Sequence, residues 1–137
     1  MNIDEIVENF QYLDDWEDRY KYLIELGNGL AEFPDDQRNS RNKVNGCVSQ
    51  VWIICDLSSD TDPILTFQGD SDAHIVRGLI AVTLAIFSGK KASEIREIDE
   101  TAYFNEIGLQ EHITPQRSNG LISMVKRIKD SAANVTT

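Results

Sequence analysis

One segment near the middle of the chain is apolar around nearly its whole circumference, and it constrains the fold more than any other feature. Its apolar positions lie within residues 73–88: Ile75, Val76, Leu79, Ile80, Val82, Leu84, Ile86 and Phe87. A helix that is apolar on most sides must be buried on most sides. The unbroken apolar stretch is also far shorter than the ~20 residues that a membrane span requires. We therefore predict a central core helix with the rest of the chain packed around it.

The residues on either side of this segment predict where the helix begins and ends. Asp70, Ser71 or Asp72 can cap its N-terminus, and Gly89 stands just past its end. Three capping residues in a row have this simple explanation, so the acidic cluster alone does not indicate a binding site.

Further helices are expected at both ends of the chain. Asn2 is placed to cap the first, with Glu5 three residues later, and a second helix is expected from Trp16 to a stop at Gly27 and Gly29. A polar loop follows over residues 32–42. The remaining predicted helices span residues 93–98, 100–107 and 114–133, the last opened by Thr114 and Pro115.

Between the loop and the core helix, the pattern changes to that of β-strands. Residues 48–57 are rich in β-branched and aromatic side chains, residues 58–63 form a turn, and residues 64–68 form the returning strand of a hairpin. A further short strand is possible at residues 43–45. We expect one α+β domain over residues 1–137, with a small antiparallel sheet of about three strands packed against helices.

The charge balance argues against several kinds of partner. The 137 residues include 13 Lys and Arg against 23 Asp and Glu, a net charge of −10. This balance repels phosphate groups, so nucleic acid and anionic membranes are not expected partners. The first residues are acidic and lack the pattern of a signal peptide. We expect a cytoplasmic protein.

Two cysteines differ in their surroundings. Cys47 follows Gly46 on the loop that leads into the first strand, so its thiol can be presented at a loop tip. A small buried apolar residue is an equally good interpretation, and the local sequence does not decide between them. Cys55 lies inside an apolar strand and is expected to be buried and structural. An extended segment of eight residues would keep the two sulfurs too far apart for a disulfide.

Other chemistry finds little support. Cys47, Cys55, His74 and His112 show no zinc-ligand spacing, and no phosphate-binding glycine loop is present. Arg117 falls in the first turn of the last helix, where a cation adds to the positive end of the helix dipole. It could steady a nearby anion such as a thiolate, but a solvated arginine is the simpler interpretation.

Four segments taken together resemble the SufE family of sulfur acceptors. They are IELG at residues 24–27, VNGCVSQVW at 44–52, GDSDAHIVRGL at 69–79 and HITPQRSNGL at 112–121. They occur in the family's order and extend over most of the chain. The residues after the cysteine, SQVW at 49–52, resemble SufE more than its CsdE paralogues.

The resemblance implies a fold shared with the U-type iron–sulfur scaffold proteins. It implies that Cys47 accepts a sulfane sulfur from the persulfide of a SufS-type cysteine desulfurase and passes it to a Suf-type scaffold complex. Family members also stimulate the desulfurase, and the pyridoxal phosphate belongs to that partner, so no cofactor or metal is expected here. We hypothesise that Asp70 and Arg117 help to position or charge-balance the loop that Gly46 hinges. A homodimer is possible.

Two other functions stay open at this point. The chain could be a binding module that activates a desulfurase without carrying sulfur, with Cys47 incidental. It could also be a thiol-based redox sensor, although Cys55 is badly placed to act as a resolving cysteine.

Overall fold

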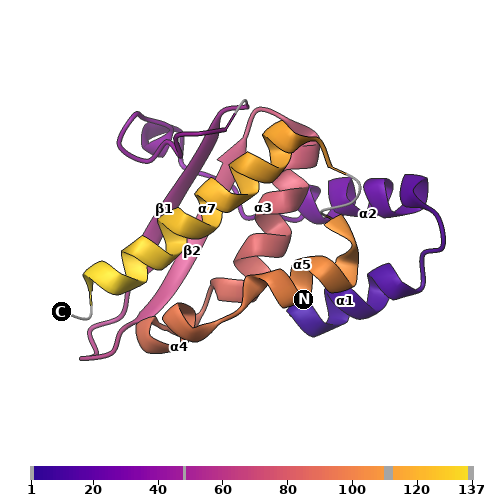
Figure 1. Cartoon of the computed structure of the whole chain (residues 1–137). Helices are drawn as coiled ribbons and strands as arrows, with labels where there is room; N and C mark the ends of the chain where they lie inside the picture. The colour runs from indigo at the N-terminus through magenta and orange to yellow at the C-terminus, as the bar shows by residue number, and fades with distance from the viewer. Residues whose placement is uncertain (1, 48, 110–112, 136–137) are drawn as a thin grey trace.

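The computed structural model describes residues 2–47, 49–109 and 113–135. Figure 1 shows the sheet and α7 at one end of the molecule, α1 and α2 at the other, and α3 between them. In chain order, the elements are α1 (Ile3–Gln11), α2 (Trp16–Asn28), the short 3-10 helix η1 (Asp35–Gln37), β1 (Val51–Leu57), β2 (Ile64–Ser71), α3 (His74–Phe87), β3 (Lys90–Lys91), α4 (Ala92–Glu97), α5 (Glu100–Ile107) and α7 (Pro115–Asn134). The α+β fold is as expected from the sequence.

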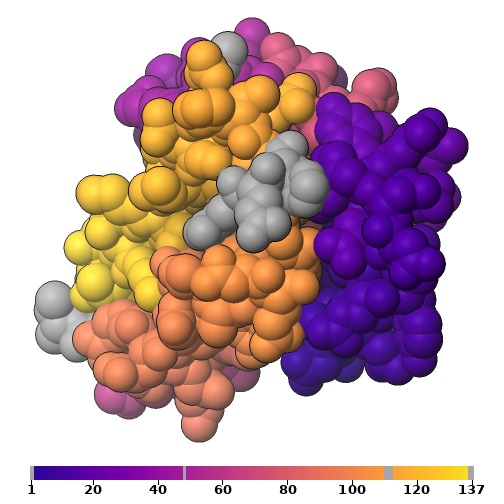
Figure 2. All heavy atoms as spheres, turned by 45° about the vertical axis from the view of Figure 1, so that its right-hand side comes forward, coloured from indigo at the N-terminus to yellow at the C-terminus, as the bar shows by residue number. Residues whose placement is uncertain are grey.

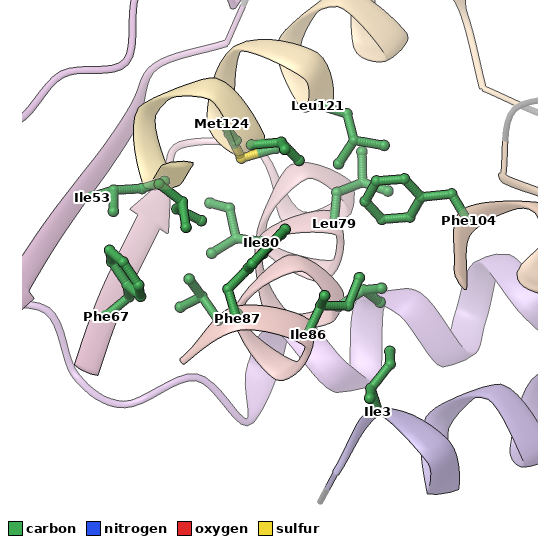
Figure 3. Close-up of a cluster of buried hydrophobic side chains, with 14 of the residues drawn as sticks. Ile3, Ile53, Phe67, Leu79, Ile80, Ile86, Phe87, Phe104, Leu121 and Met124 are labelled. Atoms are coloured by element: carbon green, nitrogen blue, oxygen red, sulfur yellow. The ribbon is translucent and has the colours of Figure 1, made fainter. Parts of the chain in front are cut away.

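Helix α3 is the core of the molecule, as its apolar circumference predicts. Ten of its 14 residues are buried, and it packs against β2, α1, α2 and α7. Figure 3 shows its side chains among those of the surrounding elements. The residues labelled there come from α1, both long strands, α3, α5 and α7: Ile3, Ile53, Phe67, Leu79, Ile80, Ile86, Phe87, Phe104, Leu121 and Met124.

The predicted caps of this helix are wrong at its N-terminus. The N-cap residue is Ala73, which offers no side-chain hydrogen bond. Strand β2 continues as far as Ser71, so the acidic cluster belongs largely to the strand and its side chains have other partners. The predicted C-terminal stop is confirmed, because Gly89 follows the helix with a φ of 80°.

The sheet has the order β1-β2-β3, with antiparallel neighbours. β1 pairs with β2 from Val51 opposite Ser71 to Leu57 opposite Leu65. The strands differ from the prediction in extent: residues 49 and 50 precede β1, Val48 lies outside the described residues, and β2 runs beyond residue 68. The third strand is β3, whereas Lys43 forms only an isolated bridge with Trp52. Strand β3 has only two residues, which is too short for the alternation of apolar and polar side chains that predicts a strand.

The first two helices form as predicted, except at Gly27. Asn2 caps α1 by accepting a 2.9 Å hydrogen bond from the Glu5 amide. Gly27 lies inside α2 rather than after it, where α2 crosses α3 closely. A Cβ added at Gly27 would lie 2.7 Å from the Gly78 nitrogen, and one at Gly78 would lie 2.2 Å from the Leu23 carbonyl oxygen. The two glycines are therefore packing residues at the helix crossing.

The C-terminal helices follow the prediction closely. Thr114 caps α7, because its Oγ1 accepts a 3.3 Å hydrogen bond from the Arg117 amide. Figure 2 shows α5 and α7, in orange and yellow, beside the indigo N-terminal helices on one face of the molecule, and α1 packs against α5. None of the described helices is both long and apolar enough to cross a membrane.

Candidate functional site

Cys47 lies at the tip of a tight hairpin that precedes the sheet. The Val44 amide donates to the Val51 carbonyl oxygen at 2.8 Å, and the Ile53 amide donates to the Asn42 carbonyl oxygen at 3.0 Å. These bonds bring the two arms of the hairpin together and leave Cys47 between them. We call residues 41–47 and 49–52 the cysteine hairpin.

Gly46 gives the tip its conformation. Its φ is 93°, a backbone region that favours glycine. A Cβ at this position would also lie 2.6 Å from the Ser123 Oγ of α7. The glycine is therefore required both by the turn and by the close approach of the hairpin to α7.

The thiol of Cys47 rests against the same helix. Its Sγ lies 3.7 Å from the Gly120 carbonyl oxygen. A Cβ at Gly120 would lie 3.3 Å from that sulfur. The absence of a side chain at Gly120 therefore makes room for the thiol.

A cavity of about 410 Å³ opens beside Cys47. It lies among the cysteine hairpin, α3 and the first half of α7, and is lined by Cys47, Ser49, Val76, Leu79, Thr114, Gln116, Arg117, Gly120 and Met124. The thiol is half-buried, and burial raises its pKa above the ordinary value of 9.0, because removal from water disfavours the thiolate. The two interpretations of Cys47 are thus combined: the thiol is partly withdrawn, yet it faces a cavity.

Arg117 lines this cavity from the first turn of α7. The sequence placed it in that turn and left open whether it lies near Cys47. The side chain is half-buried rather than fully solvated, and its Nη1 donates to the Tyr20 hydroxyl at 3.5 Å. It is a cationic group that lines the same cavity as Cys47, at the positive end of the α7 dipole.

Asp70 is not among the cavity-lining residues. Its carboxylate forms ion pairs with Arg38 at 2.8 Å and with Arg77 at 3.2 Å. Its side chain is 13% exposed. Asp70 therefore joins the segment before the cysteine hairpin to β2 and α3, and any effect on Cys47 is indirect.

Asp72 contacts the hairpin directly, although the sequence suggested only a helix cap. Its Oδ1 accepts a 3.0 Å hydrogen bond from the Gln50 amide, and its own amide donates to the Gln50 carbonyl oxygen at 3.4 Å. The sequence carries no signal for this contact, because an Asp just before a helix is equally typical of a cap. Asp72 fixes the second arm of the cysteine hairpin.

Cys55 is half-buried, not fully buried as expected. Its Sγ lies 3.7 Å from the Asp56 carbonyl oxygen. Burial, together with the nearby Asp56 carboxylate, raises its pKa to about 11. A pKa this high keeps the thiol almost entirely protonated at neutral pH, which lowers its reactivity as a nucleophile.

The remaining candidates do not assemble a metal site in the part of the chain that the structure describes. No group of three or more His, Cys, Asp or Glu side chains there is arranged to hold an ion. His74 is exposed at the start of α3. His112 lies outside the described residues.

Comparisons with known proteins agree with the motifs. The model of the SufE Fe-S metabolism associated domain matches residues 4–132. An uncharacterized SufE-like protein of Rhizobium meliloti (strain 1021) is 58% identical over 132 residues, covering 96% of this chain and 94% of the relative. One of Rhizobium etli is 55% identical over 132 residues, covering 96% and 89%.

The fold has also been seen before. The solution structure of a hypothetical protein from Thermus thermophilus superimposes with a TM-score of 0.76 at 18% identity, covering 97% of this chain and 94% of the other. At that identity the likeness shows the fold alone. The match over residues 4–132 and the two close relatives show that the chain belongs to the SufE family, whose domain is associated with Fe–S metabolism.

Proposed function

We propose that this protein is a sulfur carrier for iron–sulfur cluster assembly. Cys47 accepts a sulfane sulfur from the persulfide of a SufS-type cysteine desulfurase and passes it to a Suf-type scaffold complex. The protein also stimulates the desulfurase. The observation that carries the proposal is a half-buried thiol at a glycine-hinged hairpin tip, facing a cavity beside Arg117.

The chemistry needs one accessible nucleophile and no metal. The Cys47 thiolate attacks the terminal sulfur of the donor persulfide, an S–S bond breaks there, and the donor cysteine leaves as a thiolate. Cys47 then carries a new S–S bond as its own persulfide. No external oxidant or reductant is consumed, because the sulfane sulfur only changes its partner.

The cavity suits the resting and the loaded states. It leaves space next to the sulfur for one further atom, and Val76, Leu79 and Met124 line it with apolar side chains. A persulfide is easily reduced, so shelter from solvent thiols protects it between partners. Delivery then requires the tip to leave the cavity, which the weak contact between Cys47 and Gly120 permits.

The surrounding residues have distinct supporting roles in this proposal. Arg117 stabilises negative charge on the sulfur, Gly46 lets the tip turn, and Asp70 fixes the segment that leads into the hairpin through Arg38. We further propose a cytoplasmic location, where thiols stay reduced. Pyridoxal phosphate would be the desulfurase's cofactor.

The deciding experiment is intact mass after incubation with a SufS-type desulfurase, pyridoxal phosphate and cysteine, without reductant. A gain of one sulfur atom, reversed by reductant and absent in Cys47→Ser, is the expected result. The matched control is Cys55→Ser, which should still gain the sulfur. If no variant gains sulfur while desulfurase turnover is still stimulated, the protein is an activating module and the carrier proposal fails.

A further inference from the structure

Helix α7 presents one face to the cysteine hairpin. Gly120, Ser123 and Arg127 follow at spacings of three and four residues, which places them on the same side of a helix. The first two have little or no side chain, so the tip approaches α7 closely at Cys47 and Gly46. Arg127 is different, because it reaches the base of the hairpin.

The Arg127 guanidinium binds two carbonyl oxygens of the hairpin's first arm. Its Nη1 donates to the Lys43 carbonyl oxygen at 3.2 Å, and its Nη2 donates to the Arg41 carbonyl oxygen at 2.8 Å. On its other side, the arm is bonded to β1: the Asn42 carbonyl oxygen accepts from the Ile53 amide, and the Val44 amide donates to the Val51 carbonyl oxygen. Four consecutive residues are thus held alternately by β1 and by Arg127.

The base of the hairpin is therefore held more strongly than its tip. Hydrogen bonds from a guanidinium are charge-assisted and about twice as strong as neutral ones. The contact from Cys47 to Gly120 is a weak thiol–carbonyl contact at 3.7 Å. With the base fixed and the tip loosely held, the position of the base sets where the thiol lies.

We infer that Arg127 is a positioning residue for Cys47. By holding the carbonyl oxygens of Arg41 and Lys43, it keeps the cysteine hairpin against α7 and so keeps the thiol in the cavity. The inference rests on the proposed function for the use that is made of Cys47, but the placement of the thiol can be tested without it. Lysine cannot replace this arginine fully, because an ammonium lacks the planar fork that spans two acceptors.

The test compares the two cysteines within the same molecule. Native protein, Arg127→Met, Arg127→Lys and the control Lys126→Met are treated with iodoacetamide at pH 8, and each labelled site is followed by peptide mass spectrometry. Lys126→Met is a matched control because it removes a neighbouring positive charge whose ion pair is with Asp130, on the same helix. Cys55 is the internal reference, since it lies in β1, outside the hairpin tip, and is not one of the residues whose carbonyl oxygens Arg127 binds.

We expect the ratio of Cys47 to Cys55 labelling rates to rise about fivefold in Arg127→Met, consistent with the loss of charge-assisted hydrogen bonds. Arg127→Lys should give a smaller rise, and Lys126→Met should match the native protein. An unchanged ratio in Arg127→Met, or equal acceleration at both cysteines, would overturn the inference. If Arg127→Met does not fold, the same criteria apply to Arg127→Lys.

Sulfur acceptance provides a second measurement. In the desulfurase assay, Arg127→Met should gain sulfur more slowly than Lys126→Met. If labelling responds as expected but no variant gains sulfur, the proposed function fails while the positioning role stands. If sulfur is gained but labelling does not respond, the positioning role fails and the proposed function stands.

Discussion

The sulfur of Cys47 lies 3.7 Å from the carbonyl oxygen of Gly120, a residue 73 positions later in the chain. This contact exists because α7 has no side chain at that point. The helix surface therefore helps to shape the thiol's resting place.

Replacing Gly120 by alanine should displace the thiol without unfolding the protein. The new Cβ would stand 3.3 Å from the Cys47 sulfur, closer than such contacts usually are. Alanine also gains about 1 kcal/mol of helix propensity, which offsets the crowding. We expect a free energy of unfolding within about 1 kcal/mol of native and Cys47 alkylation about threefold faster. Alkylation at the native rate would show that the hairpin absorbs the methyl group in place.

The reactivity of Cys47 should depend on pH in the manner of a buried thiol. Burial raises its pKa above 9.0, so the thiolate fraction at pH 8 is smaller than for an exposed cysteine. Iodoacetamide rates measured from pH 7 to 10.5 should have a higher midpoint in the folded protein than in urea. A folded midpoint at or below that of the unfolded chain would contradict this prediction.

Arg117 should matter through its charge. In the proposed mechanism, Arg117 stabilises the negative charge on sulfur in the cavity that it lines together with Cys47, and Arg117→Ala removes that stabilisation. Persulfide formation should slow by about fivefold, the effect of ~1 kcal/mol of charge–charge interaction. Arg117→Lys retains the charge and should recover most of the rate. Equal rates for native protein and Arg117→Ala would remove Arg117 from the proposed mechanism.

Cys55 should make the fold sensitive to alkali. Its pKa is raised from 9.0 to about 11 in the folded protein. A raised pKa contributes stability that is fully present below the unfolded value and is lost as pH rises through the folded value. Urea unfolding of native protein and Cys55→Ala should therefore show a steeper loss of stability in the native chain between about pH 9 and about pH 11. Parallel pH curves would argue against the raised pKa.

The crossing of α2 and α3 should not tolerate a side chain. A Cβ at Gly78 would lie 2.2 Å from the Leu23 carbonyl oxygen, so the backbones must separate. We expect Gly78→Ala to lower the free energy of unfolding by about 3 kcal/mol. At Gly29 the nearest atom to a new Cβ is 3.4 Å away, and Gly29→Ala should stay within about 0.5 kcal/mol of native. Similar midpoints in urea for both variants would contradict the close crossing.

The sequence predicted the helices and the core well because their signals are local. The apolar circumference of α3 requires that this helix be buried, whatever the arrangement of the other elements. Asn2 and Thr114 cap their helices with their own side chains. Gly27 was misread for the same reason. A glycine near the end of a helical pattern looks like a stop, and only the position of α3 reveals that it serves packing.

The site was predictable only in part, since it is built from segments far apart in the chain. Cys47 and Gly46 could be singled out from their own neighbourhood, and Arg117 from its place in a helix. That Arg117 shares the cavity with Cys47, while Asp70 pairs with Arg38 and Arg77 instead, depends on how α7 and β2 are packed. Asp72 looked like a cap because the end of β2 could not be foreseen.

The fixed points of the cysteine hairpin limit how far its sulfur can travel. Val44 is bonded to Val51, and Gln50 is bonded to Asp72. Cys47 is three residues from each of these attachments, and three residues of chain span at most about 11 Å. While both attachments hold, the α-carbon of Cys47 stays within that radius. In the proposed sulfur transfer, the hairpin therefore supplies only this short movement, and any longer reach has to come from the partner protein.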